Sequence, residues 1–487
     1  MNIKILKREN IYNIENKIQP TYNLMNKAGK LSAKYINKNL PKKNILILSG
    51  IGGNGGDGFV LAHELYNKYK WNVSISIIGN LNKIKGDAKK AYKNLSLKSV
   101  EFESIKFEKI NYIVDAIFGI GLSRKITNKN LKILKKINDT NIPIIALDIP
   151  SGVDCNTGDI LGFAPKCSIT ISYSFYKIGQ FLLPGAQKCG KVILLDIGIP
   201  KSLTKDITPN IIINSESIWL KKIKWPKLTD HKYSRGYTLI VGGPKEMTGA
   251  SRLSALSAQR IGSGIVVLAC DNNSANIYYK TLTTQIVKSY KNTIEFNNII
   301  NDNRIDSFVI GPGLGINKSS KIKIKNILQM NKNTIIDADA ISCFAGDLKT
   351  FKTLIKNKNV IITPHEGELK KLFPNLKCNV VEKAIFAAKK LNTIVILKSS
   401  TTVIATPKNK VIINKYGAKW LSTAGSGDVL AGILGGLTSN KMELIYAAAF
   451  GVWLHTEAAK DFGPGLTAED IPNIIPKTYK KLLKKIV

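Results

Sequence analysis

Acidic residues are scarce in this chain of 487 residues: it has 34 Asp and Glu but 72 Lys and Arg, and its formal net charge is +38. Such a balance occurs in proteins that bind nucleic acids or anionic surfaces. The chain lacks, however, any basic block interleaved with aromatic residues, because its lysines are scattered among Asn and Ile in every segment. We therefore expect no specific nucleic-acid partner. A nucleic-acid-binding protein remains the alternative of a different class.

Cysteine pairs with metal-binding spacing are missing as well. The six cysteines show no Cys-x-x-Cys pattern, which argues against a zinc site and a disulfide framework and is typical of a reducing cytoplasm. No apolar run approaches the roughly 18 residues that span a bilayer. Residues 1–10 also lack the apolar core of a signal peptide. We therefore predict a cytoplasmic protein that does not enter a membrane.

Apolar residues and glycine are plentiful, with 44% hydrophobic residues and 38 glycines, as in a globular protein. A chain of this length is too long for one typical core, which favours two domains. The alternation of strands and helices fades between residues 201 and 228, where Trp225-Pro226 indicates a boundary. We predict an α/β fold with two domains, residues 1–215 and 222–487.

The first half opens with a predicted helix over residues 11–35 and a strand over 44–49. A glycine-rich loop at residues 50–58 and a helix over 59–69 follow. This order of strand, loop and helix is typical of a doubly wound α/β unit, whose ligand lies at the carboxyl end of the strand. The loop is not the spaced Gly-x-Gly-x-x-Gly of a dinucleotide-binding fold.

Polar residues follow successive strands of the first half, namely Asn54, Asp115, Asp148 and Ser151. The carboxyl ends of parallel strands meet at one edge of a sheet, so we expect these side chains to lie together. Two carboxylates, an amide and a hydroxyl could bind a monovalent cation or could form an acid/base set. A single Asp at a strand end is more often a helix cap than a catalyst.

The second half contains the segment that most strongly indicates chemistry. Residues 423–427 are small and glycine-rich, and Asp428 and a predicted helix follow them. Backbone amides at such a helix start bind phosphate. A carboxylate placed there could take a proton from a hydroxyl that attacks a phosphoryl group. The alternative is a glycine-rich turn in which Asp428 caps the helix.

Four segments of the first half resemble the NAD(P)H-hydrate epimerase domain: residues 24–29, 50–58, 115–125 and 147–152. The resemblance implies a Rossmann-like three-layer α/β sandwich, an acid/base role for Asp148, and K⁺ bound by Asn54, Asp115 and Ser151. It implies that the substrate contacts Gly53, Asn54, Gly55, Gly56, Asp57, Gly119, Ile120, Gly121, Leu122, Ser123, Arg124, Lys125 and Asp148. The glycine loop departs from the family at Ile51, where Pro is usual, and at Gly53, where Asn is usual.

The second half, from about residue 231 to 471, resembles the ribokinase-like fold and the ADP- or ATP-dependent NAD(P)H-hydrate dehydratases. The resemblance implies that Asp428 deprotonates the hydroxyl of the hydrated ring, and that Ala250, Gly313 and His365 contact the hydrate. It implies that the nucleotide is held by Lys398, Ser399, Ser400, Thr401, Thr402 and Gly427. Ser399 and Ser400 replace the usual Gly-Ala. Phosphoryl transfer also leads us to expect Mg²⁺.

Both resemblances concern one metabolite, so we predict a bifunctional repair enzyme for the hydrates NADHX and NADPHX. The first domain would interconvert the R and S epimers. The second would dehydrate the S epimer with ADP, releasing AMP and phosphate. The resemblance also implies a homo-oligomer. The alternative enzyme is a ribokinase-like kinase of a small alcohol, such as a vitamin precursor, with the first domain as a scaffold.

Overall fold

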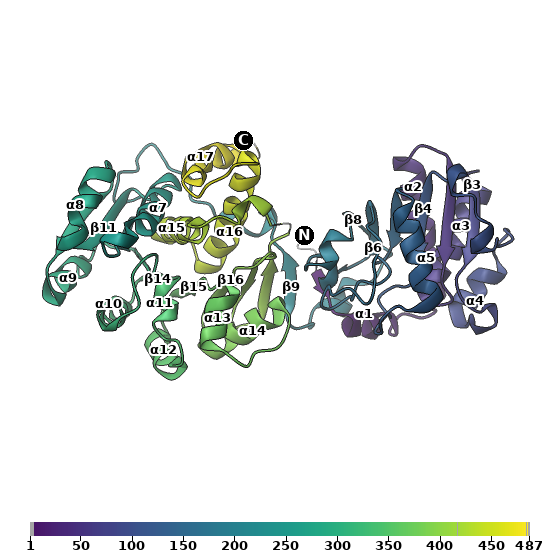
Figure 1. Cartoon of the computed structure of the whole chain (residues 1–487), viewed down its shortest axis with the longest axis horizontal. Helices are drawn as coiled ribbons and strands as arrows, with labels where there is room; N and C mark the ends of the chain where they lie inside the picture. The colour runs from purple at the N-terminus through teal and green to yellow at the C-terminus, as the bar shows by residue number, and fades with distance from the viewer. Residues whose placement is uncertain (1–3, 416, 484, 486–487) are drawn as a thin grey trace. The chain divides into compact units, whose positions relative to one another are not determined.

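The computed structural model describes residues 4–415, 417–483 and 485. These residues divide into two compact units, one ending at Thr208 and the other beginning at Pro209. Each unit alternates strands with helices that cover its sheet (Figure 1), which confirms the predicted two-domain α/β fold class. The domain limits 1–215 and 222–487 stay predictions. Strand β9 (Asn210–Ile213) pairs in parallel with a strand of the second unit, β18 (Lys410–Ile413).

The first unit is built on a parallel sheet with helices on both faces. Alternate residues of a strand point to opposite faces, and the two apolar faces of this sheet differ in what covers them. Ile45 and Ile47 pack with helices α2, α3 and α4, whereas Leu46 and Leu48 pack with α5. The sheet order is β3 (Asn72–Ile77), β2 (Asn44–Ser49), β4 (Tyr112–Ala116), β5 (Ile144–Leu147), β6 (Ile169–Tyr173) and β8 (Lys191–Leu195). The helices are α2 (Tyr22–Asn39), α3 (Gly53–His63), α4 (Gly86–Lys93) and α5 (Asn128–Asp139).

The N-terminal segment differs from the single helix predicted over residues 11–35. Strand β1 (Lys4–Leu6) pairs with β7 (Tyr176–Lys177) and leads into helix α1 (Arg8–Glu15), and α2 begins only at Tyr22. Pro20 lies in the break between the two helices. Proline has no backbone N–H and disfavours helical geometry at the preceding residue, so the helix cannot continue through this point.

The glycine-rich segment also differs from the prediction of a loop over residues 50–58 and a helix over 59–69. Helix α3 already begins at Gly53, and a π-helical turn, Glu64–Lys68, follows it. A Cβ atom on Gly55 would lie 1.8 Å from the Gly50 carbonyl oxygen, and one on Gly58 would lie 2.4 Å from Ser49 Oγ. The glycines therefore let the helix start directly against the end of β2.

The second unit contains a larger sheet, which is parallel from β12 to β16 and antiparallel through β17 and β18. Its order is β12 (Ile286–Tyr290), β11 (Ile265–Asp271), β10 (Tyr237–Val241), β13 (Ser307–Ile310), β14 (Asn333–Ile336), β15 (Val360–Ile362), β16 (Ile394–Leu397), β17 (Val403–Ala405), β18 and β9. Its helices are α6 (Glu216–Trp219), α7 (Thr248–Arg260), α8 (Asn272–Thr281), α9 (Thr293–Ile300), α10 (Lys318–Gln329), α11 (Asp339–Ser342), α12 (Leu348–Ile355), α13 (Glu366–Leu372), α14 (Val380–Leu391), α15 (Ser426–Ser439), α16 (Leu444–Phe462) and α17 (Asp470–Leu483).

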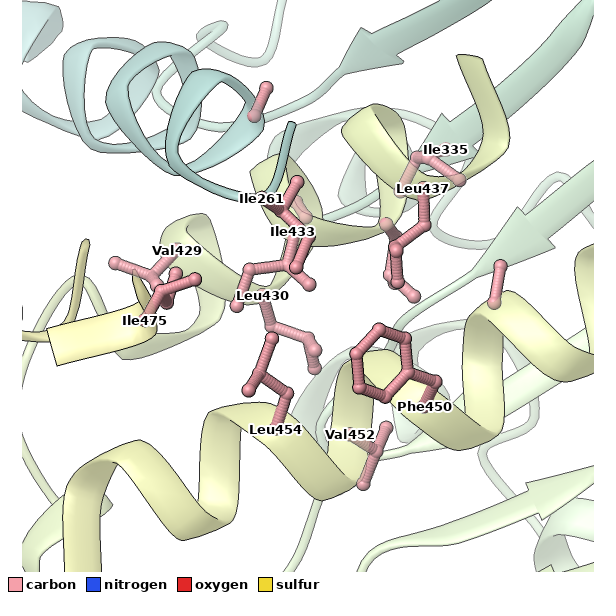
Figure 2. Packing of buried hydrophobic residues seen from close by; sticks show 14 of the residues in the cluster. Ile261, Ile335, Val429, Leu430, Ile433, Leu437, Phe450, Val452, Leu454 and Ile475 are labelled. Carbon is pink, nitrogen blue, oxygen red and sulfur yellow. The ribbon is translucent and has the colours of Figure 1, made fainter. Parts of the chain in front are cut away.

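Helix α15, which carries Asp428, lies at the centre of the core of the second unit. Figure 2 shows Leu430 and Leu437 of α15 beside Leu454 and Phe450 of α16, and all four are buried. Full burial of side chains of this size contributes about 1.5–3 kcal/mol each. A Cβ on Gly432 would lie 2.1 Å from the Ser254 carbonyl oxygen of α7, so the two helix backbones are in close contact. The helix start is therefore held on a rigid support.

No helix within the described ranges combines the length and the apolar character that crossing a membrane requires.

Candidate active sites

The first unit contains a cavity of about 870 Å³ at the carboxyl ends of β2, β4 and β5. Many of the residues predicted to contact the substrate line it: Gly53, Asn54, Asp57, Gly119, Ile120, Gly121, Leu122, Ser123, Arg124 and Asp148. Lys125 is not among the lining residues. Neither are Gly55, which is packed against the Gly50 carbonyl, and Gly56, which is packed against the Met25 side chain. The geometry thus gives these two glycines a packing role.

The three residues predicted to bind K⁺ lie together beside this cavity. Asp115 is fully buried and accepts hydrogen bonds from Ser151 N at 2.8 Å and from Ser151 Oγ at 2.6 Å. Ser151 Oγ lies 3.3 Å from the carbonyl oxygen of Phe118, to which Asn54 Nδ2 donates at 3.1 Å. The predicted ligands are therefore linked through one carbonyl group.

Two features of this group fit a bound monovalent cation. Asn54 Oδ1 is buried and has no hydrogen-bond partner among the described residues. Burial raises the pKa of Asp115, although hydrogen bonds from Ser151 and Ile117 offset part of the loss of water around its carboxylate. A buried acceptor without a donor is costly. A cation held by the amide, carboxylate, hydroxyl and carbonyl oxygens would remove that cost.

Asp148 meets a lysine that the sequence pattern did not single out. Asp148 has φ +64°, an uncommon value for a residue with a side chain. Its carboxylate forms an ion pair with Lys177, whose side chain is only 2% exposed. Lys177 Nζ also donates to Ser172 Oγ at 3.0 Å, and Gln180 Nε2 donates to the Asp148 carbonyl at 2.7 Å. These contacts fix the position of the Asp148 carboxylate at the cavity.

Two further carboxyl groups, those of Glu15 and Asp57, line the same cavity. Burial, and then the negative charge of Asp148, raise the pKa of Glu15 to about 7, while Lys177 opposes the shift. Burial and the charges of Asp148 and Glu15 raise the pKa of Asp57 well above its usual value. Three carboxyl groups thus share one buried ammonium, which favours retention of a proton among them.

In the second unit, Asp428 lies in the first turn of α15, directly after the glycine-rich segment. Gly425 before the helix has φ +86°, a conformation that favours glycine. The half-buried Asp428 carboxyl has its pKa raised to about 7 by burial and by Asp337, against the charge of Lys398. A carboxyl group with a pKa in this range is suited to accept and release protons at neutral pH.

An ion pair between Asp337 and Lys398 lies beside Asp428. Asp337 follows β14 and Lys398 follows β16, and Lys398 Nζ donates to Asp337 Oδ1 at 2.6 Å. Thr363 Oγ1 donates to the same oxygen at 2.7 Å. Burial opposes the charge on Lys398, but Asp337 and Glu368 outweigh it and raise the pKa of this lysine. The site therefore keeps a positive charge suited to a phosphate ligand.

Of the other predicted residues, Gly427 lies at this ion pair, while Gly313 and Ala250 lie against each other. A Cβ on Gly427 would lie 3.0 Å from Lys398 Nζ, and one on Gly313 would lie 3.1 Å from the Ala250 side chain. Ser399, Ser400, Thr401 and Thr402 form the connection between β16 and β17. His365 caps helix α13, because its Nδ1 accepts from Gly367 N at 2.9 Å and from Glu368 N at 3.2 Å. Its contact with the hydrate stays a prediction.

Comparisons with known proteins cover nearly the whole chain. A family model described as NAD(P)H-hydrate dehydratase matches residues 238–477, and one described as YjeF-related protein N-terminus matches residues 21–179. The bifunctional NAD(P)H-hydrate repair enzyme Nnr of Dictyoglomus turgidum is 32% identical over 523 residues, which cover 99% of this chain and 99% of that protein. The protein of the same name from Moorella thermoacetica is 28% identical over 501 residues, covering 96% and 94%.

The chain belongs to the family of bifunctional NAD(P)H-hydrate repair enzymes. Membership confirms the predicted repair activity, which joins an epimerase to a dehydratase. It leaves the kinase and nucleic-acid interpretations without support. Among solved structures, a ribokinase-like superfamily protein from Enterococcus faecalis V583 matches with a TM-score of 0.51 and 24% identity, over 56% of this chain and 96% of that one. This likeness shows the ribokinase-like fold of the second unit of the repair enzyme.

The dehydratase unit offers one carboxylate oxygen that fits Mg²⁺. The described residues contain no group of three or more His, Cys, Asp or Glu side chains arranged to hold a metal ion. Mg²⁺ does not require one, because it commonly binds one or two carboxylates together with waters and substrate phosphates. Asp337 Oδ2 is buried and has no hydrogen-bond partner among the described residues, and it would lie 3.7 Å from a Cβ on Gly427. It is therefore a candidate ligand.

His455 of α16 is a further residue of this region to which the sequence assigned no role. Its side chain is 7% exposed, its ring contacts the backbone of Ser426, and its Nε2 has no partner in the described part of the chain. Burial lowers the pKa of His455 to about 4. The ring is therefore neutral at pH 7 and packs behind the start of α15.

This burial predicts an acid-sensitive dehydratase unit. The unfolded chain protonates His455 near pH 6.5 and the folded chain only near pH 4, so the unfolded state binds more protons between these values and acid favours unfolding. From pH 7 to pH 5 this histidine should remove about 2 kcal/mol of the free energy of unfolding. The measurement is urea unfolding followed by tryptophan fluorescence. Between pH 7 and pH 5, His455→Gln should lose less free energy of unfolding than the wild type, by that amount.

The matched control is His231→Gln, which changes an exposed histidine of the same unit and should keep the wild-type dependence on pH. Identical pH dependence in wild type and His455→Gln would contradict the assignment of His455 as a buried neutral ring.

Proposed function

We propose that the first unit interconverts the R and S hydrates of NADH and NADPH, and that the second unit dehydrates the S hydrate with ADP as the phosphoryl donor. One observation carries the dehydratase half of the proposal. Asp428, whose pKa is raised to about 7, lies in the first turn of a helix with a glycine-rich start, close to the half-buried charge of Lys398. A base and an anion-binding helix start thus occur at one point.

In the proposed dehydration, Asp428 takes the proton from the hydroxyl on the hydrated ring carbon. The hydroxyl oxygen attacks the terminal phosphoryl group of ADP, a new P–O bond forms, and AMP leaves. The backbone amides of residues 424–427 stabilise the negative charge that develops on the transferred group. We assign to Lys398, whose Nζ lies next to Gly427, the role of offsetting phosphate charge.

Phosphorylation solves the leaving-group problem of the reaction, because hydroxide is a poor leaving group and phosphate a good one. The lone pair of the ring nitrogen forms a C=N bond as the C–O bond to phosphate breaks. Loss of a proton from the neighbouring ring carbon then restores the reduced nicotinamide. When bound, Mg²⁺ supplies charge neutralisation on the nucleotide phosphates, and Asp337 is the residue that we propose to hold it.

The proposed epimerisation also breaks the C–O bond of the hydrated ring carbon with help from the ring nitrogen, but it does so without phosphorylation. An acid protonates the hydroxyl, the C–O bond breaks with help from the ring nitrogen, and water adds to the opposite face. We assign to Asp148 the removal of a proton from the incoming water. Its ion pair with Lys177 supports this role, since the buried lysine fixes the carboxylate at the cavity.

We infer that Asn54, Asp115 and Ser151 hold K⁺ in the epimerase. When bound, K⁺ supplies the positive charge that buried Asp115 lacks and a partner for Asn54 Oδ1. The hydrogen bond from Asn54 to the Phe118 carbonyl already connects the start of α3 to the segment that contains Phe118, and both border the cavity.

A cytoplasmic location and a homo-oligomeric state are also part of the proposal. The six cysteines are free thiols, which supports a reducing compartment. The homo-oligomer rests on the family resemblance of both domains.

We expect Asp428→Asn to lower the rate of S-NADHX dehydration about 1,000-fold or more, because the amide cannot accept the hydroxyl proton. Epimerisation by the same protein should be unchanged. In the wild type, kcat/KM for dehydration should rise as the pH increases through about 7, because the base must be ionised. The measurement is the return of reduced-nicotinamide absorbance with ADP and Mg²⁺.

Glu443→Gln, which neutralises an exposed carboxylate of the same unit, is the control and should keep full activity. An Asp428→Asn variant with more than a tenth of wild-type dehydration would rule out Asp428 as the base.

For the cation site, we expect K⁺ to raise the melting temperature of the first unit relative to Li⁺ and to increase the epimerisation rate, because it binds only the folded site. Asn54→Ala removes the unpartnered oxygen and should abolish both effects, whereas Asn82→Ala, at an exposed amide, should preserve them. A response to K⁺ that survives Asn54→Ala undiminished would place the cation elsewhere.

A further inference from the structure

Helix α1 forms part of the epimerase cavity, although it lies outside residues 21–179, the segment that the N-terminal family model matches. Ile11, Tyr12 and Glu15 of this helix line the cavity, as does Asn16 directly after it. A Cβ on Gly121 would lie 2.9 Å from the Tyr12 hydroxyl, so the helix is in close contact with the predicted substrate loop. The cavity wall is therefore completed by a segment outside the matched region.

The position of α1 is fixed at its N-terminal end by a set of specific bonds. Arg8 Nη2 donates to the Leu122 carbonyl at 2.7 Å and forms an ion pair with Asp154 at 3.2 Å. Arg8 N donates to Asn156 Oδ1 at 2.8 Å, and Asn156 Nδ2 donates to Glu9 Oε1 at 2.9 Å. These bonds join α1 to the loop that contains Leu122, which lines the cavity, and to the segment that contains Asp154 and Asn156.

The strand that precedes α1 ties the helix to the buried lysine. In the parallel pair of β1 and β7, Leu6 is in register with Lys177. The chain therefore runs from the partner of Lys177 directly into the helix that carries Glu15. The relative placement of Glu15 and the Asp148–Lys177 ion pair follows from this pairing and from the bonds of Arg8.

The Glu15 carboxyl is half-buried, and no described side chain donates a hydrogen bond to it. Burial and the charge of Asp148 raise its pKa to about 7, so it carries a proton over part of the neutral range. Charged and titratable groups of the other elements also border the cavity: Asp57 of α3, Asp87 of α4, Arg124 of the substrate loop, Asp148 after β5, Tyr173 of β6, Lys177 of β7, and Tyr12 of α1 itself.

We propose that Glu15 is the catalytic acid of the epimerase, an inference that rests on the proposed function of the first unit. The Glu15 carboxyl gives its proton to the ring hydroxyl, and the C–O bond breaks as the ring nitrogen forms a C=N bond and water leaves. Water then adds to the other face of the ring carbon, and Asp148 takes its proton. Transfer of that proton from Asp148 back to Glu15 restores the starting state, so no oxidant, reductant or further reactant is needed.

The test uses the full chain and pure R-NADHX, with epimerisation and ADP-dependent dehydration measured in the same preparation. We expect Glu15→Gln to lower the epimerisation rate about 100-fold or more and to leave dehydration of S-NADHX unchanged. In the wild type, kcat/KM for epimerisation should fall as the pH rises above about 7, because the acid must be protonated. Glu15→Gln should lose this dependence, and Glu15→Asp should keep it with part of the activity.

Glu108→Gln, which neutralises an exposed carboxylate of the same unit, is the control and should behave as wild type. Epimerisation by Glu15→Gln within about threefold of wild type, or with the same alkaline decline, would overturn the role of Glu15. A wild-type protein that dehydrates the S hydrate but does not epimerise would instead overturn the proposed function of the first unit. If Glu15→Gln lowers the melting temperature of that unit, the epimerisation rate of Glu15→Asp becomes the test. A Glu15→Asp protein that is folded but does not epimerise would overturn the proposal.

Discussion

A lysine that is withdrawn from water, fully at Lys177 and partly at Lys398, and that faces more carboxyl groups than it can neutralise is the interaction on which both sites depend. In the first unit Lys177 pairs with Asp148 while Glu15 and Asp57 border the same cavity. In the second, Lys398 pairs with Asp337, and burial together with the negative charges of Asp337 and Glu368 raises the pKa of the neighbouring Asp428.

Water screens such charges at a protein surface, whereas charges withdrawn from water interact strongly with one another. The ammonium fixes its partner carboxylate in place. Burial and the neighbouring negative charge raise the pKa of Glu15 and of Asp428 to about 7. Each site thereby contains an ionised group and a group able to exchange a proton at the pH of the cell. This is the requirement of a reaction in which a hydroxyl must be protonated or deprotonated before a C–O bond breaks.

The folds keep these charges in place by the topology of parallel sheets. Asp148 follows β5, and Asp337 and Lys398 follow β14 and β16, so each site lies along the carboxyl edge of its sheet. Glycines permit the close approach that this requires: Gly55 and Gly58 bring α3 against the end of β2, and Gly432 brings α15 against α7. Because α15 is packed tightly against α7, the backbone amides at its start can bind an anion without reorganisation.

The fold class and the position of Asp428 could be predicted from the sequence, because strand ends and glycine-rich segments can be recognised from neighbouring residues. The α/β class followed from the alternation of elements, and Asp428 followed from the residues on either side of it. The break between α1 and α2 was missed, although Pro20 was its signal, since an apolar spacing typical of one helix spans both.

Glu15, Lys177 and His455 could not be assigned in this way. Lys177 lies 29 residues from its partner Asp148, and Glu15 approaches the site because β1 pairs with β7 and Arg8 anchors the start of α1. Lysine and glutamate are so common in this chain that neither stands out by composition. Their roles depend on burial, which a sequence without its fold does not reveal. The signal that could have found Lys177 was its place in an otherwise apolar strand region.

The most direct test of the account is to mix the protein with R and S NADHX in the presence of K⁺, Mg²⁺ and ADP, and to follow the absorbance of reduced nicotinamide. Two activities on one chain predict recovery of NADH from both epimers, with AMP and phosphate released in equal amounts. Recovery that stops at the S fraction would contradict an active epimerase in the first unit, and absence of any recovery would contradict the account as a whole.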